Sequence, residues 1–232
     1  MESGQCIVAY FGPELPAELS GLRGLVWVPL VHVRPREADA RRAAELLASG
    51  AYDCAAVTSP RGVEVLRAAL GRWPGRVRPY CIGAGTSRAF AEAFGLTPRV
   101  PEVYDSAGLA RAMAGDGCRR AITIRSSAGD DELERALLSS GVDVVRVDVY
   151  DELAAAPPEV PHFTVAVVTS SVIARAFCEH AWTRNPRATV IAMGPKTEAA
   201  LRSSCKGLGE VLMPQERSFK AILSLLKALG CG

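Results

Sequence analysis

Blocks of apolar residues alternate along the chain with amphipathic segments. Short apolar runs bounded by Gly, Pro or Asp are typical of strands buried on both faces of a parallel sheet. Such strands are predicted at residues 5–11, 24–28, 53–57, 79–83, 97–100, 120–125, 143–150, 164–169, 188–193 and 209–213. Apolar positions at helical spacing predict helices at residues 14–22, 37–49, 60–70, 86–94, 106–114, 131–140, 172–182, 196–204 and 216–229. Strict alternation with short connections implies α/β doubly wound, mostly parallel sheets.

Two proline-containing segments divide this pattern. Residues 29–35 are bracketed by prolines, and residues 151–163 contain Pro157, Pro158 and Pro161, which favours extended linkers. The three strands after the second linker make too small a sheet alone, so we expect the two N-terminal strands to complete it. The sequence therefore predicts two flavodoxin-like domains, one built from 1–33 plus 152–232 and the other, 34–151, inserted through a two-strand linker.

An internal repeat supports the duplication. Thr58 and Thr169 each follow an apolar strand and precede a helix, and they are 111 residues apart. Gly83 and Gly194 stand in a second strand-turn-helix pattern and are also 111 residues apart. Two independent motifs at one offset indicate a repeated α/β unit. We expect the function where the two copies face each other.

Charge and cysteine content narrow the function classes. The net charge of +2 gives no argument for binding nucleic acid or a membrane surface, so local groups must hold any anionic ligand. No apolar run approaches the roughly 18 residues of a membrane span. The seven cysteines are scattered and include no Cys-x-x-Cys pair. This odd count predicts a reducing cytoplasm, buried thiols and no disulfide framework.

Familiar catalytic and nucleotide motifs are missing from the sequence. The turn Gly83-Ala-Gly85 lacks the third glycine of the dinucleotide fingerprint, because Arg88 stands there. The three histidines, His32, His162 and His180, follow no metal or triad pattern, and ordinary surface or core histidines are the expected alternative. We therefore predict neither a nucleotide nor a metal.

Hydroxyl residues at the strand ends remain as candidates. The carboxyl ends of parallel strands form the ligand crevice of open α/β sheets, and each following helix presents free N–H groups that bind carboxylates. For each residue, simple helix capping stays an equal alternative. The candidate substrate-binding hydroxyls are Thr58, Ser59, Thr86, Thr169, Ser170 and Thr197.

Cations and one phenol accompany these hydroxyls. Arg61, Arg88, Arg125 and Lys196 lie at or just after strand ends, where each either pairs with a ligand carboxylate or is simply solvated. Tyr150 ends the strand that returns to the first domain. Its phenol points either into the crevice or into linker packing.

Taken together, several motifs resemble the uroporphyrinogen-III synthase family. They cover most of the chain, and their order and spacing are more specific than any one of them. The motifs are Val28-Pro-Leu30, Thr58-Ser-Pro-Arg-Gly-Val63, Ile82-Gly-Ala-Gly-Thr86, Gly141 to Tyr150, Thr169-Ser-Ser171 with Ala174 and Phe177, and Met193 to Leu201 followed by Pro214. Two departures are Tyr10-Phe-Gly-Pro13 after the first strand, where we place no substrate contact, and Ser171 in place of a proline.

The resemblance implies a cofactor-free lyase that cyclises hydroxymethylbilane with inversion of ring D, giving uroporphyrinogen III and water. It implies Tyr150 as the catalytic candidate that assists hydroxyl loss, with Thr58, Ser59, Arg61, Thr86, Thr169, Ser170 and Thr197 as family positions that contact substrate. Lys196 joins the predicted substrate contacts because of its place at the strand end. The expected partner is the linear tetrapyrrole, with transient contact to hydroxymethylbilane synthase and a monomeric state. The alternative is a non-catalytic two-lobed binding protein or sensor for an anionic small molecule.

Overall fold

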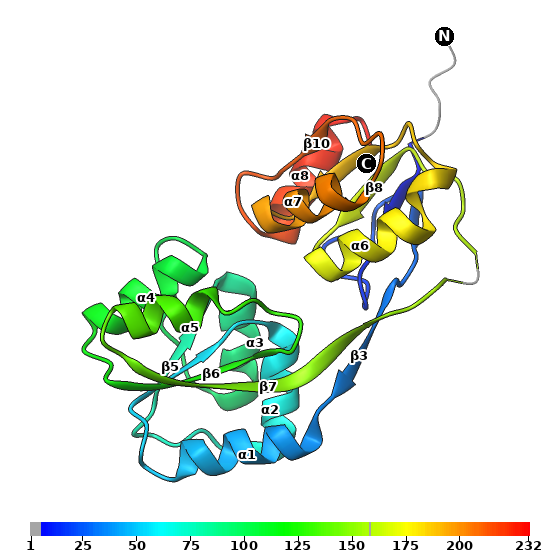
Figure 1. Cartoon of the computed structure of the whole chain (residues 1–232). Coiled ribbons are helices and arrows are strands. Elements are labelled where there is room, and N and C mark those ends of the chain that lie inside the picture. The colour runs from blue at the N-terminus through cyan, green and yellow to red at the C-terminus, as the bar shows by residue number, and fades with distance from the viewer. Residues whose placement is uncertain (1–5, 158) are drawn as a thin grey trace. The chain divides into compact units, whose positions relative to one another are not determined.

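The computed structural model of the chain describes residues 6–157 and 159–232 and contains two compact units (Figure 1). Gln5 and Pro158, which fall in predicted segments, lie outside the described residues. Unit 1 comprises Met1–Val33 and Leu153–Gly232, and unit 2 comprises Arg34–Glu152. Each unit has one five-stranded sheet, so the doubly wound α/β class predicted from the sequence is confirmed.

The sheet of unit 1 has the strand order β10-β9-β8-β1-β2. Every strand pair is parallel. If the five strands of this unit are numbered one to five along the chain and the sheet is followed from β2 to β10, the order is 2-1-3-4-5, as in flavodoxin-like folds. The N-terminal strands do complete the C-terminal sheet. The strands are β1 (Val8–Tyr10), β2 (Leu25–Trp27), β8 (Val165–Val168), β9 (Thr189–Ala192) and β10 (Val211–Leu212).

Helices cover both faces of this sheet because successive strand residues point to opposite sides. Val165 and Val167 pack in one cluster with Ile222 of α8 (Phe219–Ala228). Ala166 packs in the opposite cluster with Phe177. That second cluster is covered by α6 (Ser171–His180), the short 3-10 helix η1 (Trp182–Arg184) and α7 (Pro195–Ser204).

Unit 2 has the strand order β3-β7-β6-β4-β5. The β4–β5, β4–β6 and β6–β7 pairs are parallel. The strands are β3 (Val31–Pro35), β4 (Cys54–Val57), β5 (Arg78–Cys81), β6 (Arg120–Ser126) and β7 (Asp143–Ala154). The helices are α1 (Glu37–Ala48), α2 (Pro60–Leu70), α3 (Ala84–Phe94), α4 (Ser106–Gly115) and α5 (Glu132–Ser139).

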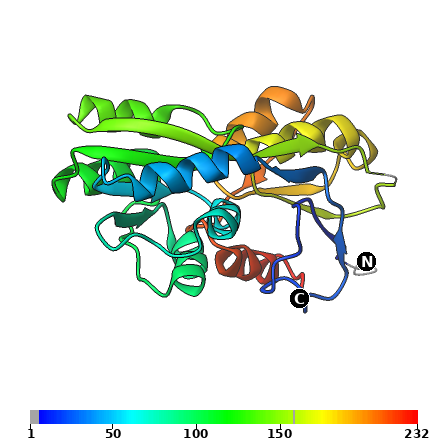
Figure 2. The same cartoon turned by 90° about the horizontal axis from the view of Figure 1, so that it is seen from below.

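Two groups of helices enclose the sheet of unit 2. Leu109 and Met113 of α4 and Leu133 of α5 pack on Ala56 and Tyr80 at one face. On the other face, α1 contacts α2 and α2 contacts α3. Figure 2 shows the two groups on either side of the strands.

Strands β3 and β7 carry the chain between the units. The N–H of Ala155 donates to Leu30 O at 2.9 Å, and the N–H of Arg36 donates to Val149 O at 2.9 Å. Residue numbers rise along one strand as they fall along the other, so the two strands run in opposite directions, as the two-strand linker requires.

Two predicted elements are wrong. Residues 14–22 form turns rather than a helix, because Gly12, Pro13 and Pro16 leave no uninterrupted helical segment. Residues 97–100 are not a strand, and this segment contributes only one isolated bridge, between Tyr80 and Arg99.

The prediction that the cysteines form no disulfides is also wrong. Three pairs are bonded: Cys6–Cys231, Cys54–Cys118 and Cys178–Cys205. Cys81 is a buried free thiol. Each pair joins segments 27 or more residues apart within one unit, so local spacing carried no sign of it. The cysteines therefore do not indicate a reducing compartment.

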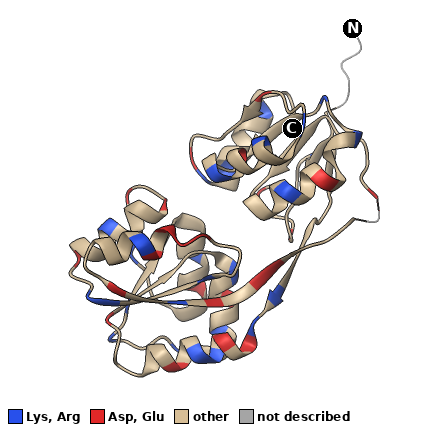
Figure 3. Cartoon of the chain, viewed as in Figure 1, with Lys and Arg blue, Asp and Glu red and all other residues tan. Residues whose placement is uncertain are grey.

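Charged residues are mixed over both units, with Lys and Arg interspersed among Asp and Glu (Figure 3). This agrees with the small net charge of +2. Among the described residues, no helix is both long and apolar enough to cross a bilayer.

Candidate functional site

The repeat found in the sequence is a repeat of helix starts. Ser59 caps α2 by accepting a hydrogen bond from the N–H of Gly62 at 3.0 Å. Ser170 caps α6 in the same way, accepting from the N–H of Ile173 at 3.2 Å. Helix capping is therefore part of what these serines do, as the alternative interpretation held. Thr58 and Thr169 immediately precede the caps, at the carboxyl ends of β4 and β8.

The second half of the repeat has no side-chain cap. Gly83 precedes α3 and Gly194 precedes α7, both with extended backbone, at φ −169° and −177°. Thr86 and Thr197 stand in the first turns of these helices, each 5% exposed. In each unit the two motifs lie on adjacent strands, β4 with β5 and β8 with β9. Hydroxyls and helix N-termini therefore converge at the carboxyl edge of each sheet, separately in each unit.

Tyr150 reaches the carboxyl edge of unit 2 through an irregularity in its strand. The β6–β7 register shifts between Arg125 and Ser126, so that Ser126 pairs with Tyr150. Such a bulge re-aims a side chain. The Tyr150 hydroxyl donates to Ser59 Oγ at 2.9 Å, although β6 lies between their strands. The phenol thus points at the predicted hydroxyl cluster rather than into linker packing.

Burial raises the pKa of Tyr150 to about 12, against opposing hydrogen bonds with Ser59 and Ser126. The phenol is protonated at neutral pH and acts as a hydrogen-bond donor. Ser59 Oγ accepts from both Tyr150 and Gly62, so its own hydroxyl proton is left to donate. Arg61 lowers the Tyr150 pKa through its charge, and its guanidinium forms an ion pair with Glu64.

The carboxyl edge of unit 1 encloses a small cavity of about 220 Å³. It brings together four of the predicted residues, Thr169, Ser170, Lys196 and Thr197. The Ser171 hydroxyl donates to Lys196 O at 3.2 Å and so links the first turns of α6 and α7. The full lining is Thr169, Ser170, Ser171, Met193, Gly194, Lys196, Thr197 and Arg217.

Two residues of this edge were missed by the sequence analysis. Tyr10 ends β1, and its buried phenol hydrogen-bonds Thr169; burial raises its pKa to about 12. Its position at the end of a strand was a usable signal. Arg217 comes from the segment between β10 and α8, which has no counterpart among the repeated motifs. No local pattern identified it.

Arg125 does not serve the site as the sequence suggested, whereas Arg88 stays a candidate. Arg125 is 7% exposed and donates to Glu134 Oε2 at 2.7 Å and to Asp130 O at 2.7 Å. A guanidinium held in a buried ion pair supports the fold and is not offered to a ligand. Arg88 is an exposed residue of α3, and its role as a substrate contact stays a prediction.

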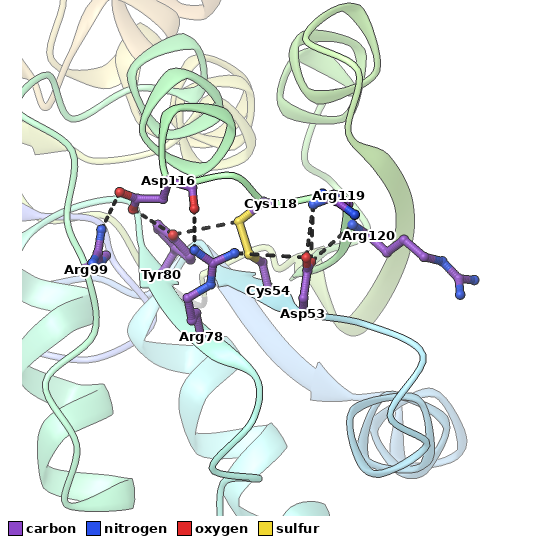
Figure 4. The surroundings of a disulfide bond; sticks show 9 residues. All are labelled: Asp53, Cys54, Arg78, Tyr80, Arg99, Asp116, Cys118, Arg119 and Arg120. Carbon is purple, nitrogen blue, oxygen red and sulfur yellow. Dashed lines mark hydrogen bonds and ion pairs between the residues drawn. A yellow bond between two sulfur atoms is a disulfide. The ribbon is translucent and has the colours of Figure 1, made fainter.

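One group of described residues has metal-ligand character, at the opposite, amino edge of unit 2. Ligand atoms of Asp53, Cys54 and Cys118 lie within 4.8 Å of one another. The two sulfurs are joined in a disulfide, and the Asp53 carboxylate accepts from the N–H groups of Arg119 and Arg120 (Figure 4). A disulfide provides no thiolate, so this group does not fit a metal site.

Comparison with known proteins adds the family. The model of the family described as uroporphyrinogen-III synthase HemD matches residues 20–224. No curated protein matches the chain.

Two solved structures are similar over nearly the whole chain. The uroporphyrinogen-III synthetase of Helicobacter pylori has a TM-score of 0.66 at 16% identity, covering 97% of this chain and 100% of that one. A mutant uroporphyrinogen III synthase of Thermus thermophilus has a TM-score of 0.61 at 20% identity, covering 97% and 99%. At these identities the structures show a shared fold.

Proposed function

The chain belongs to the uroporphyrinogen-III synthase family, and we propose that it cyclises hydroxymethylbilane, with inversion of ring D and loss of water, to uroporphyrinogen III. The observation that carries this proposal is the family match over residues 20–224. Membership makes the chain an enzyme, a cyclising lyase acting on a tetrapyrrole.

The chemistry suits the sites described above. The hydroxyl of the hydroxymethyl group takes up a proton and leaves as water, and the substituted carbon of ring D then attacks the resulting electrophilic azafulvene. The spiro intermediate fragments and recloses with ring D inverted. The substrate supplies most of the reactivity, so the protein chiefly positions it and prevents closure to the symmetric isomer. This is why we propose a cofactor-free reaction.

We assign Tyr150 the role of donor to the departing hydroxyl. Its phenol has one proton, which it donates to Ser59 in this structure and would turn to the departing hydroxyl once substrate binds, where a donor at hydrogen-bond distance assists the departure. Substrate carboxylates take the helix N-termini and hydroxyls of each edge. In unit 2 these are Thr58, Ser59, Arg61 and Thr86, and in unit 1 they are Thr169, Ser170, Lys196 and Thr197.

The surroundings of the reaction complete the proposal. The chain acts as a monomer in the cytoplasm and receives its substrate through transient contact with hydroxymethylbilane synthase. Disulfides are rare in the cytoplasm outside hyperthermophiles, so the three disulfides are an observation that this location must accommodate.

The direct test supplies hydroxymethylbilane, generated in situ, to the purified chain, oxidises the products and separates the uroporphyrin isomers. We expect isomer III to dominate. Isomer III no higher than without enzyme would refute the activity and favour the non-catalytic binding protein.

The site assignment is tested by Thr197→Val, which removes a hydroxyl at nearly constant volume. We expect a raised KM for the bilane. Thr189→Val is the matched control. Thr189 begins β9, the strand that leads into α7, and so stands at the opposite, amino edge of the sheet. Equal KM values for the two variants would contradict the assignment.

A further inference from the structure

The cavity at the carboxyl edge of unit 1 is built for an anion. Among the described residues that line it, the two charged ones, Lys196 and Arg217, are both cations. The remaining polar groups are hydroxyls, which can donate to a carboxylate. The first turns of α6 and α7 line the same space, and the positive ends of their helix dipoles favour an anion there.

Arg217 is set into this cavity against Gly194. A Cβ atom built on Gly194 would lie 2.8 Å from Arg217 Nε and 3.4 Å from Cδ and Cζ. The backbone at Gly194 is extended and would accept any residue. The glycine is therefore needed for space rather than for its backbone conformation. A methyl group there would displace the guanidinium from its present position.

We infer that Arg217 is a substrate-binding residue whose guanidinium takes one carboxylate of the tetrapyrrole at the unit 1 edge. This inference rests on the proposed function, since it names a contact for the same substrate. A guanidinium binds a carboxylate through two parallel N–H···O bonds, which a lysine cannot reproduce. Lys196 in the same cavity supplies a second, less directional charge.

The test compares KM and kcat for the wild type, Arg217→Gln and Arg217→Lys with in-situ bilane. Losing a charge-assisted pair worth about 1.5–3 kcal/mol corresponds to a rise of roughly 10- to 100-fold in KM. We expect this rise for Arg217→Gln with kcat within about twofold, because the contact is present before and during reaction. The KM of Arg217→Lys should fall between those of the wild type and Arg217→Gln. Arg175→Gln, an exposed cation of α6 outside the cavity lining, is the charge-matched control.

A second variant tests the geometry without removing the charge. Gly194→Ala should raise KM as Arg217→Gln does, because the added methyl displaces the guanidinium. In an Arg217→Ala background the same change should have little further effect, since such coupling is expected only between contacting residues. Gly209→Ala controls for the loss of a glycine, because a Cβ there would contact nothing within 4 Å.

Three outcomes separate the inference from the activity. Isomer III formation with an unchanged KM in Arg217→Gln would overturn the role of Arg217 alone. A full Gly194→Ala effect that persists in the Arg217→Ala background would show that the methyl acts on the substrate directly and would also overturn it. Wild-type product at the no-enzyme isomer ratio would overturn the proposed function together with this inference.

Discussion

Removing the disulfide between Cys6 and Cys231 should destabilise unit 1 more than removing the other disulfide of that unit, Cys178–Cys205. The first bond joins the segment before β1 to the end of the segment after α8 and spans 225 residues. The second spans 27 residues between α6 and the residue after α7. Both pairs belong to the same unit, so the loop length is the main difference between them.

The magnitude follows from the entropy that a cross-link removes from the unfolded chain. For a loop of 225 residues this is about 5.4 kcal/mol, and for a loop of 27 residues about 3.6 kcal/mol. If unit 2 stays folded within the loop, the larger value falls by about 0.7 kcal/mol, because the cost depends on the logarithm of loop length. We therefore expect a difference of about 1.9 kcal/mol, or about 1.2 kcal/mol if unit 2 stays folded, between the two alanine double variants, Cys6→Ala/Cys231→Ala and Cys178→Ala/Cys205→Ala.

Urea unfolding followed by tryptophan fluorescence separates the two units when each unit is measured in a variant whose other tryptophans are replaced by Phe. Trp27 and Trp182 report unit 1, and Trp73 reports unit 2. The Cys54→Ala/Cys118→Ala variant is the control, because its loss of stability should appear in the unfolding curve reported by Trp73. A Cys6→Ala/Cys231→Ala variant that loses less stability than the shorter-loop variant, or that loses it in the Trp73 signal, would refute the reasoning.

Two further predictions concern single side chains of unit 2. Tyr150→Phe should lower kcat about 10-fold or more, while the lost hydrogen bond to Ser59 should cost only about 1 kcal/mol of folding stability. Tyr80→Phe, which removes another phenol hydrogen bond, is the control. Equal kcat values for the two variants would contradict the proposed donor role of Tyr150. Asp151 has a pKa lowered to about 2, first by the Ser127 hydroxyl and then by guanidinium groups. The stabilisation that the ionised Asp151 carboxylate gives to the folded state is fully present above the unfolded-state pKa of about 4 and is lost as the pH falls through the folded-state pKa of about 2. Asp151→Asn should therefore be less stable than the wild type at pH 7 in urea titrations, and the difference should shrink as the pH falls through about 2; a difference of unchanged size at the lowest pH would contradict this.

The features that the sequence predicted correctly are those that short stretches of the chain determine. The apolar runs identified nearly every strand because both units bury their sheets on two faces. The repeat predicted the carboxyl-edge residues because Thr58 and Thr169, like Gly83 and Gly194, occupy equivalent positions before a helix. The residue types at the carboxyl edge of each sheet could therefore be predicted from the sequence alone.

Contacts between distant segments were not readable in this way. Cys6 and Cys231 meet only because the C-terminal segment returns beside the first strand, and no spacing rule encodes that return. Arg125 looked like a strand-end cation, but its partner Glu134 lies on the next helix and holds it inside the unit. Both errors come from reading a residue by its neighbours in sequence rather than in space.

The two carboxyl edges are copies in their backbone and differ in their added side chains. Each edge has a buried phenol on its hydroxyl cluster, Tyr10 on Thr169 in unit 1 and Tyr150 on Ser59 in unit 2. These tyrosines come from different strands, β1 and β7, so duplication alone did not place them. Arg217 likewise comes from a segment outside the repeated motifs. Under the proposed function, which inverts one terminal ring of four, such unequal edges would supply a difference between the two ends of the substrate that a pure repeat lacks.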